Sequence, residues 1–80
     1  MNTLTIELEA LAVDVKCLKD SLQVFLVDGR EISAPLVWFP RLHKATEQQR
    51  RNWRLIGGGI GIHWEDVDED ISVNSLLRTK

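Results

Sequence analysis

The stretch from Leu36 to Trp64 reads LVWFPRLHKATEQQRRNWRLIGGGIGIHW and concentrates the distinctive residues of this chain. All three tryptophans lie in it, although aromatic residues make up only 6% of the sequence. Five basic residues share the stretch with one acid, Glu47: Arg41, Lys44, Arg50, Arg51 and Arg54. Aromatic rings dominate the energetics of cores, and tryptophan and arginine are enriched at contact surfaces. We therefore expect this stretch to form the centre of the core and of the contact surface.

Two short helices are predicted inside this stretch. Residues 36–43 carry apolar side chains at roughly helical spacing, and Pro40 is tolerated because it comes early in the turn. Thr46 and Gln49 have the spacing of a capping box, which predicts a brief helix over 47–52. That helix is polar, so we expect it to lie on the surface and to show its arginines to water.

Residues 53–56 and 60–64 flank the glycine run of 57–59 and predict a hairpin, because glycine permits positive φ. The acid-rich segment 65–70 is then expected to be a solvated loop. Ile71 should turn inward, and Ser72 is expected to cap a last short helix. The apolar face of that helix would carry Val73, Leu76 and Leu77.

Upstream of the stretch, three consecutive antiparallel strands are predicted over 12–18, 22–27 and 30–34. The first alternates, with Val13, Val15 and Cys17 facing the core. The second is apolar on both sides and should be the most buried. Asp28-Gly29 suits a two-residue type I′ turn, in which both residues take positive φ, and Pro35 ends the third strand.

These elements predict a single α+β domain over residues 1–80: an N-terminal three-stranded antiparallel meander plus a glycine-rich hairpin, with short helices. Residues 1–10 are either an edge strand or an arm. A net charge of −2 favours neither nucleic acid nor an anionic membrane. One cysteine, no long apolar run and no signal peptide indicate a cytoplasmic protein that does not engage a membrane.

Motifs for cofactors and metals are incomplete, so none is predicted. The glycine run lacks the following helix that a phosphate loop needs. Asp66, Asp68 and Asp70 alternate like the first calcium ligands, but Ile71 stands where such a loop needs glycine. One cysteine and two histidines without short spacing make no zinc site.

His63 is the best candidate for acid–base chemistry, because a nearby carboxylate would hold and orient it. Cys17 is the only thiol that could act as a nucleophile activated by His63. The strand pattern places Cys17 in the core, where a thiol is inert. A structural histidine is the simpler interpretation. We therefore expect no catalytic residues and no enzyme, and a small enzyme using His63 ranks last among the alternatives.

Several blocks resemble the bacterial family known as domain of unknown function 2442: residues 28–42 with Thr46, 52–59, 61–64, 68–73 and 76–77. The resemblance covers about residues 12–77 and implies a small α+β domain. Some members carry an added helix-turn-helix domain, and we expect no DNA binding by that route here. Many members are encoded beside a small protein, an arrangement read as a toxin–antitoxin pair. The resemblance thus implies an antitoxin-like partner protein and supplies no catalytic residues.

We expect a non-enzymatic interaction module that binds and covers a small protein partner, such as a toxin, or associates with itself. The predicted contact residues are Trp38, Arg41, Arg50, Arg51, Trp53 and Arg54. The alternative is a nucleic-acid-binding regulatory domain that uses the Arg41–Arg54 basic stretch. Were the basic stretch and the 65–70 acids to lie on opposite faces, they would attract complementary patches on a partner or a second copy.

Overall fold

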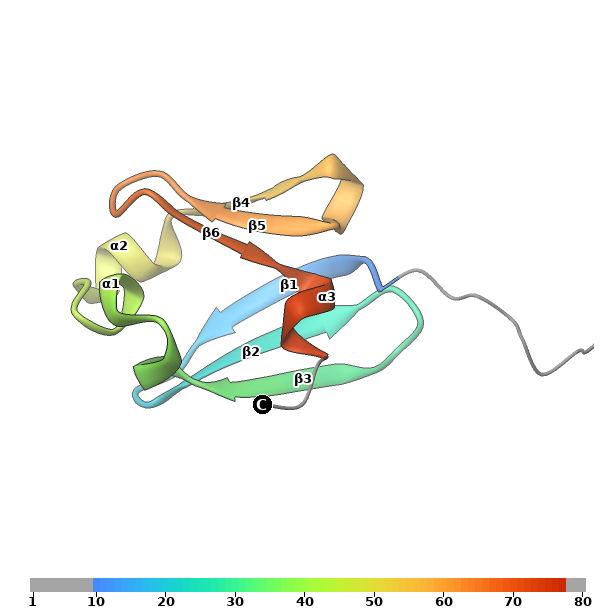
Figure 1. The fold of residues 1–80 in the computed structure, drawn as a ribbon, viewed down its shortest axis with the longest axis horizontal. Helices are drawn as coiled ribbons and strands as arrows, with labels where there is room; N and C mark the ends of the chain where they lie inside the picture. The colour runs from blue at the N-terminus through green and yellow to red at the C-terminus, as the bar shows by residue number, and fades with distance from the viewer. Residues whose placement is uncertain (1–9, 78–80) are drawn as a thin grey trace, which may run out of the picture.

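In the computed structural model, which describes residues 10–77, two three-stranded antiparallel sheets enclose one core (Figure 1). The first sheet has the order β1-β2-β3 and the second β4-β5-β6. Their bounds are β1 Ala12–Cys17, β2 Ser21–Leu26, β3 Glu31–Pro35, β4 Trp53–Ile56, β5 Gly61–Trp64 and β6 Glu69–Ser72. The predicted α+β class and the N-terminal meander are confirmed.

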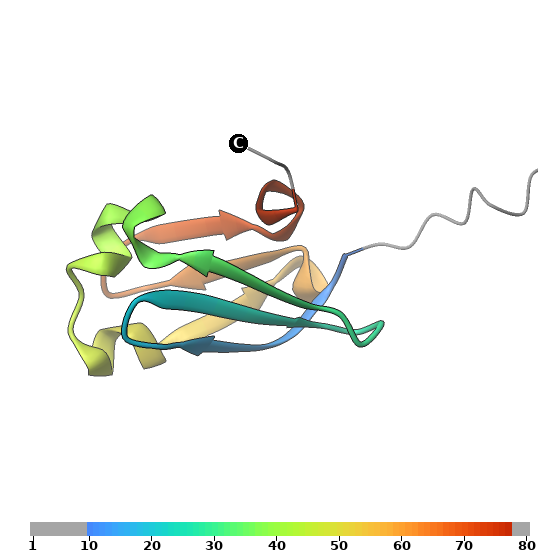
Figure 2. The same ribbon diagram turned by 90° about the horizontal axis from the view of Figure 1, so that it is seen from below.

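Short helices join and flank the sheets. Between β3 and β4 the chain forms η1 (Leu36–Trp38), α1 (Pro40–His43) and α2 (Glu47–Arg51), which gather at one end of the sheets (Figure 2). Pro40 occupies the first turn of α1, as predicted. η2 (Gly57–Gly59) forms the turn between β4 and β5, and α3 (Val73–Leu76) directly follows β6.

The core is built by the inward faces of both sheets. β2 alternates buried and half-buried residues along its whole length, as a central strand should, and it contributes Leu22, Val24 and Leu26. β5 contributes Ile62 and Trp64, and Trp64 is the largest fully buried side chain of the described residues. The strand predicted to be most buried is thus the centre of its sheet.

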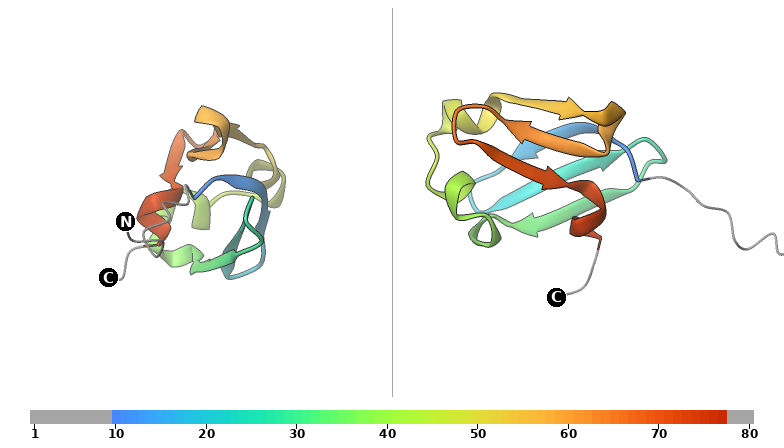
Figure 3. Two further views of the ribbon diagram at one scale, coloured as in Figure 1. Left: turned by 90° about the vertical axis from the view of Figure 1, so that its right-hand side faces the viewer. Right: turned by 45° about the horizontal axis from the view of Figure 1, so that its top comes forward.

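The edge strands β1 and β4 lie beside each other, and the seam between them joins the two sheets on one side (Figure 3). At one end of the seam Gly59 of η2 lies so close to the backbone of Ala12 that a side chain at this position would not fit. At the other end the carbonyl of Arg50 accepts hydrogen bonds from the Trp64 indole at 2.9 Å and the Cys17 thiol at 3.7 Å. The seam is therefore closed by contacts at its ends.

Two local predictions in the meander are wrong. Val13 was expected to face the core, but a register shift between Ala12 and Asp14 makes it a bulge residue, 53% exposed. The Asp28-Gly29 turn is a three-residue loop: the Leu26 amide donates to the Arg30 carbonyl at 2.8 Å. Only Gly29 takes positive φ there, at 95°, as in a type I turn with a glycine bulge.

The reason for the longer loop lies in the side chain of Asp28. Its carboxylate accepts hydrogen bonds from the backbone amide of Arg30 at 3.1 Å and from the guanidinium of Arg30 at 2.8 Å. Both contacts lower the pKa of Asp28, the backbone hydrogen bond most. An Asx-type contact two residues along the chain stabilises this turn without positive φ at Asp28.

Downstream, the hairpin of β4 and β5 and the capping box of Thr46 and Gln49 are confirmed. The acidic loop is shorter than predicted, because Glu69–Ser72 pairs with β5 as the strand β6. Ile71 is buried as expected. Ser72 precedes α3 but its side chain makes no cap, and Leu77 is exposed rather than on the packed face. The expectation for residues 1–10 falls almost wholly outside the described residues.

Candidate functional site

The six predicted contact residues divide among four elements. Trp38 lies on η1 and is 45% exposed. Arg41 lies on α1 and donates to the Asp68 carbonyl at 2.7 Å. The remaining four follow each other along α2 and β4: Arg50, Arg51, Trp53 and Arg54. The structure therefore does not gather all six on one face.

Three of them, Arg50, Arg51 and Trp53, share an open groove of about 340 Å³ with the end of β1. A second hollow of about 280 Å³ shares lining residues with this groove and extends toward the β1–β2 turn. We call the two together the trough. It is lined by Val15, Lys16, Cys17, Leu18, Lys19, Glu47, Arg50, Arg51 and Trp53.

Arg50 builds the wall of the trough. Its guanidinium donates to the carbonyls of Leu42 at 3.0 Å and His43 at 2.6 Å, which are the last carbonyls of α1. A cation at a helix C-terminus satisfies carbonyls that have no partner within the helix. Arg50 was predicted to face water, and instead it is half-buried and ties α2 to α1.

Arg51 carries the accessible cation on the same helix. Its side chain is 75% exposed and forms an ion pair with Glu47, one helical turn earlier, at 3.0 Å. An exposed pair of this kind contributes only about 0.3–0.5 kcal/mol, so the guanidinium is easily redirected to another anion. Of the two adjacent arginines, Arg51 is available for a contact outside the chain.

Cys17 also lines the trough, half-buried against the core. Burial raises the pKa of its thiol, and the nearby Arg50 charge only partly opposes that effect. A thiol with a raised pKa is a poor nucleophile at neutral pH. The expectation that Cys17 is inert therefore agrees with its surroundings, and its hydrogen bond goes to a backbone carbonyl rather than to His63.

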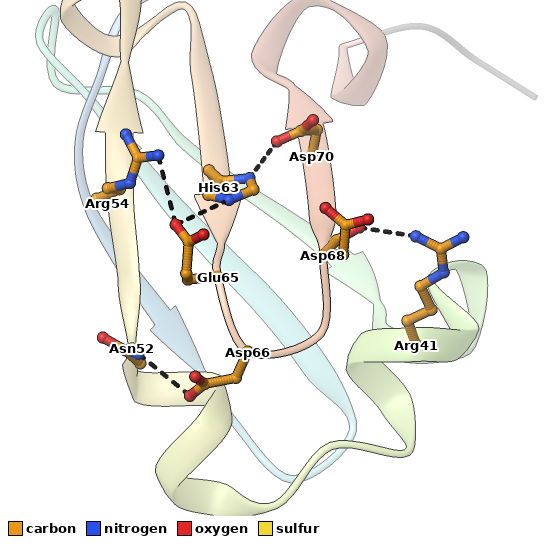
Figure 4. A network of polar contacts seen from close by, with 8 residues as sticks. All are labelled: Arg41, Asn52, Arg54, His63, Glu65, Asp66, Asp68 and Asp70. Carbon is orange, nitrogen blue, oxygen red and sulfur yellow. Dashed lines mark hydrogen bonds and ion pairs between the residues drawn. The ribbon is translucent and has the colours of Figure 1, made fainter.

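A polar network covers the outer face of the second sheet (Figure 4). Arg54, His63 and Asp70 stand in one row across β4, β5 and β6, because the strand register pairs them. The Nδ1 atom of His63 makes a short contact with the Asp70 carboxylate, while Nε2 lies 3.2 Å from Glu65. Glu65 also lies 3.5 Å from Arg54.

The surroundings of His63 favour its protonated form. The hydrogen bond to the Asp70 carboxylate raises the pKa of His63 most, and the charges of Asp70 and Glu65 add to it. Partial burial and the Arg54 charge act in the opposite direction. The ring is only 13% exposed and both nitrogens are engaged, so this histidine acts as a clasp between strands. Sequence reasoning foresaw a carboxylate partner for it but placed the acids in a loop.

The basic stretch and the acidic segment lie next to each other, not on opposite faces. Arg54 pairs with Glu65, Arg41 binds the Asp68 carbonyl, and Asn52 donates to the Asp66 carboxylate at 3.1 Å (Figure 4). Charges that neutralise each other within the domain attract a partner less. The trough is separate from these pairs and keeps its own positive charge.

A further open groove of about 340 Å³ adjoins the same outer face of the second sheet. Its apolar part is formed by Ile56, Ile60 and Ile71, and Asp70 and Ser72 supply polar atoms. Asp70 is already paired with His63, so the groove offers no uncompensated charge.

The acidic segment and the glycine run have structural roles. Asp66 and Asp70 contact Asn52 and His63, respectively, so their carboxylates do not converge as calcium ligands would. Within residues 10–77 no three His, Cys, Asp or Glu side chains are grouped as metal ligands. The glycine run forms η2 and leads into the strand β5, whereas a phosphate loop leads into a helix.

None of the helices described between residues 10 and 77 is long and apolar enough to cross a membrane.

Comparison with known proteins gives a structural relative and a family. No curated protein matches the chain. A protein of unknown function from Rhodospirillum rubrum ATCC 11170, whose crystal structure was determined at 2.75 Å resolution, has 27% sequence identity and a TM-score of 0.75. The match covers 86% of each chain. The family model described as "Protein of unknown function (DUF2442)" matches residues 12–80, and this chain belongs to that family.

Proposed function

We propose that this chain is a non-enzymatic interaction module that binds a small protein partner at the trough. The observation that carries the proposal is the position of the trough, where two of the predicted arginines and a predicted tryptophan meet the end of an edge strand. Arginine and tryptophan are the residue types that most often supply binding energy at protein interfaces. In this proposal the chain acts as an antitoxin in the bacterial cytoplasm, and its partner is a toxin encoded by the neighbouring gene.

The trough combines apolar and cationic groups at the surface. Leu18 is 46% exposed at its rim, and Trp53 is half-buried within it. Arg51 adds a charge that is weakly held by Glu47. A partly exposed aromatic ring beside arginine side chains is typical of the centre of a protein interface and less common on the rest of a protein surface.

Nucleic-acid binding is the weaker candidate, since the geometry reduces the cations available to phosphates. Arg50 is committed to the end of α1, and Arg54 and Arg41 are held at the acidic segment. Phosphate recognition gains its strength from several free cations that track a backbone. The protein carries a net charge of −2, which opposes that mode.

The proposal is tested by isothermal titration of the purified neighbour-encoded protein into this chain. Leu18→Ser and Arg51→Ala are the test variants, because both side chains are exposed and their loss spares the fold. The matched controls are Val27→Ser, which changes an exposed valine just after β2, and Lys44→Ala, which removes a cation after α1 that does not line the trough.

We expect each test variant to weaken binding by about tenfold, which is about 1.4 kcal/mol, and each control to leave it within about twofold. Equal affinities for all four variants and the unaltered chain would remove the trough from the interface. A dissociation constant that rises steeply with salt for single-stranded RNA, with no binding of the protein partner, would favour the nucleic-acid alternative.

A further inference from the structure

We propose that the trough recognises an acidic segment of its partner that carries a bulky apolar side chain, and that it does so through side chains rather than by adding a strand. This inference rests on the proposed function and specifies the chemistry of the partner. It follows from three features of the trough: its charge, its apolar floor and the state of the strand edge that borders it.

The charge of the trough is opposite to that of the whole chain. Among its lining residues are four cations and one carboxylate, Glu47, while the chain as a whole carries −2. The cations come from separate elements: Lys16 and Lys19 from β1 and its turn, and Arg50 and Arg51 from α2. A local excess of positive charge on an acidic protein steers a negative partner and fixes its orientation.

The apolar groups mark where a partner side chain would be held. Leu18 stands exposed at the rim, and Val15 and Trp53 line the inner part. Both ends of the seam beside them are fixed, by Gly59 against Ala12 and by the hydrogen bonds to Arg50. A preformed hollow of this kind accepts one large side chain without the ordering cost of building a pocket.

The edge of β1 is unsuited to strand addition. The Leu18 amide donates to the Ser21 carbonyl, so by the alternation of antiparallel pairs the amide of Val15 points away from β2, to the edge of β1 that borders the seam. That amide is already bonded to the Asp14 carboxylate at 2.8 Å. An incoming strand would have to displace this bond and would meet a negative charge at the edge. The partner is therefore held by its side chains.

A nucleic acid fits the same surface less well. The guanidinium of Arg50 is hydrogen-bonded to the α1 carbonyls. The ammonium of Lys16 lies 5.8 Å from the centre of the Phe25 ring, on the outer face of the first sheet. Of the four cations of the trough, that leaves Lys19 and Arg51, whereas phosphate recognition gains its strength from several cations along a backbone. A short acidic peptide needs only a few of them beside the apolar hollow.

The test measures fluorescence anisotropy of a labelled eight-residue peptide of alternating glutamate and leucine. A lysine–leucine peptide of the same length controls for charge, and a single-stranded oligouridine of the same length represents nucleic acid. Arg51→Glu and Lys19→Glu reverse charge in the trough. Lys44→Glu is the matched reversal outside it.

We expect the acidic peptide to bind more tightly than the basic one and to lose at least about fivefold in affinity with either trough reversal. Lys44→Glu should leave its affinity within about twofold. Absence of acidic-peptide binding at about 1 mM, equal binding of the two peptides, or an equal effect of all three reversals would overturn the inference. Displacement of the acidic peptide by the oligouridine would likewise overturn it.

Titration of the neighbour-encoded protein distinguishes the interface at the trough from its specificity for an acidic segment. If Leu18→Ser weakens that complex and Arg51→Glu leaves it unchanged, the interface stands and the acidic specificity fails. If neither variant changes the complex, the proposed interface itself fails. Weakening by both variants, with a salt dependence that Arg51→Glu reduces, supports both.

Discussion

Replacement of Gly59 by alanine tests the contact that closes one end of the seam between β1 and β4. Gly59 has φ 111°, a conformation that side-chain-bearing residues rarely adopt. A Cβ atom built there would lie 2.5 Å from the Ala12 carbonyl oxygen and 2.9 Å from the Ala12 nitrogen. Both are backbone atoms of β1, so η2 or the strand itself must move to admit the methyl group.

The expected cost follows from these two effects. Backbone strain at such a φ costs about 1–3 kcal/mol, and a forced shift of packed backbone costs about 1–3 kcal/mol more. The sum, about 2–6 kcal/mol, is a large part of the roughly 4–12 kcal/mol available to a domain of this size. Gly58→Ala is the matched control, because φ is 69° there and a Cβ would meet nothing within 4 Å. Its cost should be only about 1 kcal/mol.

The assay is urea unfolding followed by tryptophan fluorescence. With a slope of about 1 kcal/mol per molar urea, Gly59→Ala should lower the midpoint by at least about 2 M or leave the chain unfolded, and Gly58→Ala should lower it by about 1 M. Midpoints for the two variants that agree within about 0.5 M would refute the reasoning, because the approach of Gly59 to Ala12 would then cost nothing.

Three further predictions concern the helices and the clasp. The folded pKa of His63 is raised, so its contribution to stability is complete below its unfolded value of about 6.5 and is lost as pH rises through the folded value; unfolding free energies from pH 5 to 9 should show this loss, and Asp70→Asn should flatten it. Arg50→Ala should cost about 1–3 kcal/mol in urea unfolding, because two α1 carbonyls lose a charged donor, whereas Arg51→Ala should cost less than about 0.5 kcal/mol; equal losses would deny Arg50 its structural role. Thr46→Ala should cost about 1 kcal/mol and lower the melting temperature by about 4–8 °C, while Gln48→Ala, at an exposed position of the same helix, should not; an equal drop in both variants would deny the cap its specific role.

Much of the fold follows from local sequence signals. The segment 22–27, apolar on both sides, predicted the central strand of the first sheet, and the Thr46–Gln49 pattern predicted the start of α2. The glycine run predicted the turn of the second hairpin, and all of its residues take positive φ. In each case a single short segment carries the whole physical reason for the structure.

The errors arise where distant parts of the chain decide. Residues 69–72 have one strongly apolar side chain, Ile71, so their acids suggested a loop. In the structure one face of β6 is exposed to solvent, and Asp70 on that face is stabilised by His63, its paired residue on β5. The bulge at Val13 likewise depends on the register with β2, which the alternation within one strand cannot reveal.

The candidate site was only partly accessible from the sequence. The residue types at Arg50, Arg51 and Trp53 marked an interface, but nothing local distinguished the arginine that binds α1 from the one that faces water. The contribution of β1 was missed, because Lys16 and Leu18 come more than thirty residues earlier and join the trough only through the seam. Contacts between separate elements set those positions.

The connectivity of the two sheets has its own consequence. Each sheet is built from one uninterrupted piece of chain, residues 12–35 and 53–72, and the helical segment between them is the sole covalent link among the described residues. The two pieces are thus complementary halves, and a cut near Ala45 would leave each meander intact. Halves made as separate polypeptides should reassemble on mixing, so the molecule offers a natural site for splitting it into a two-part reporter.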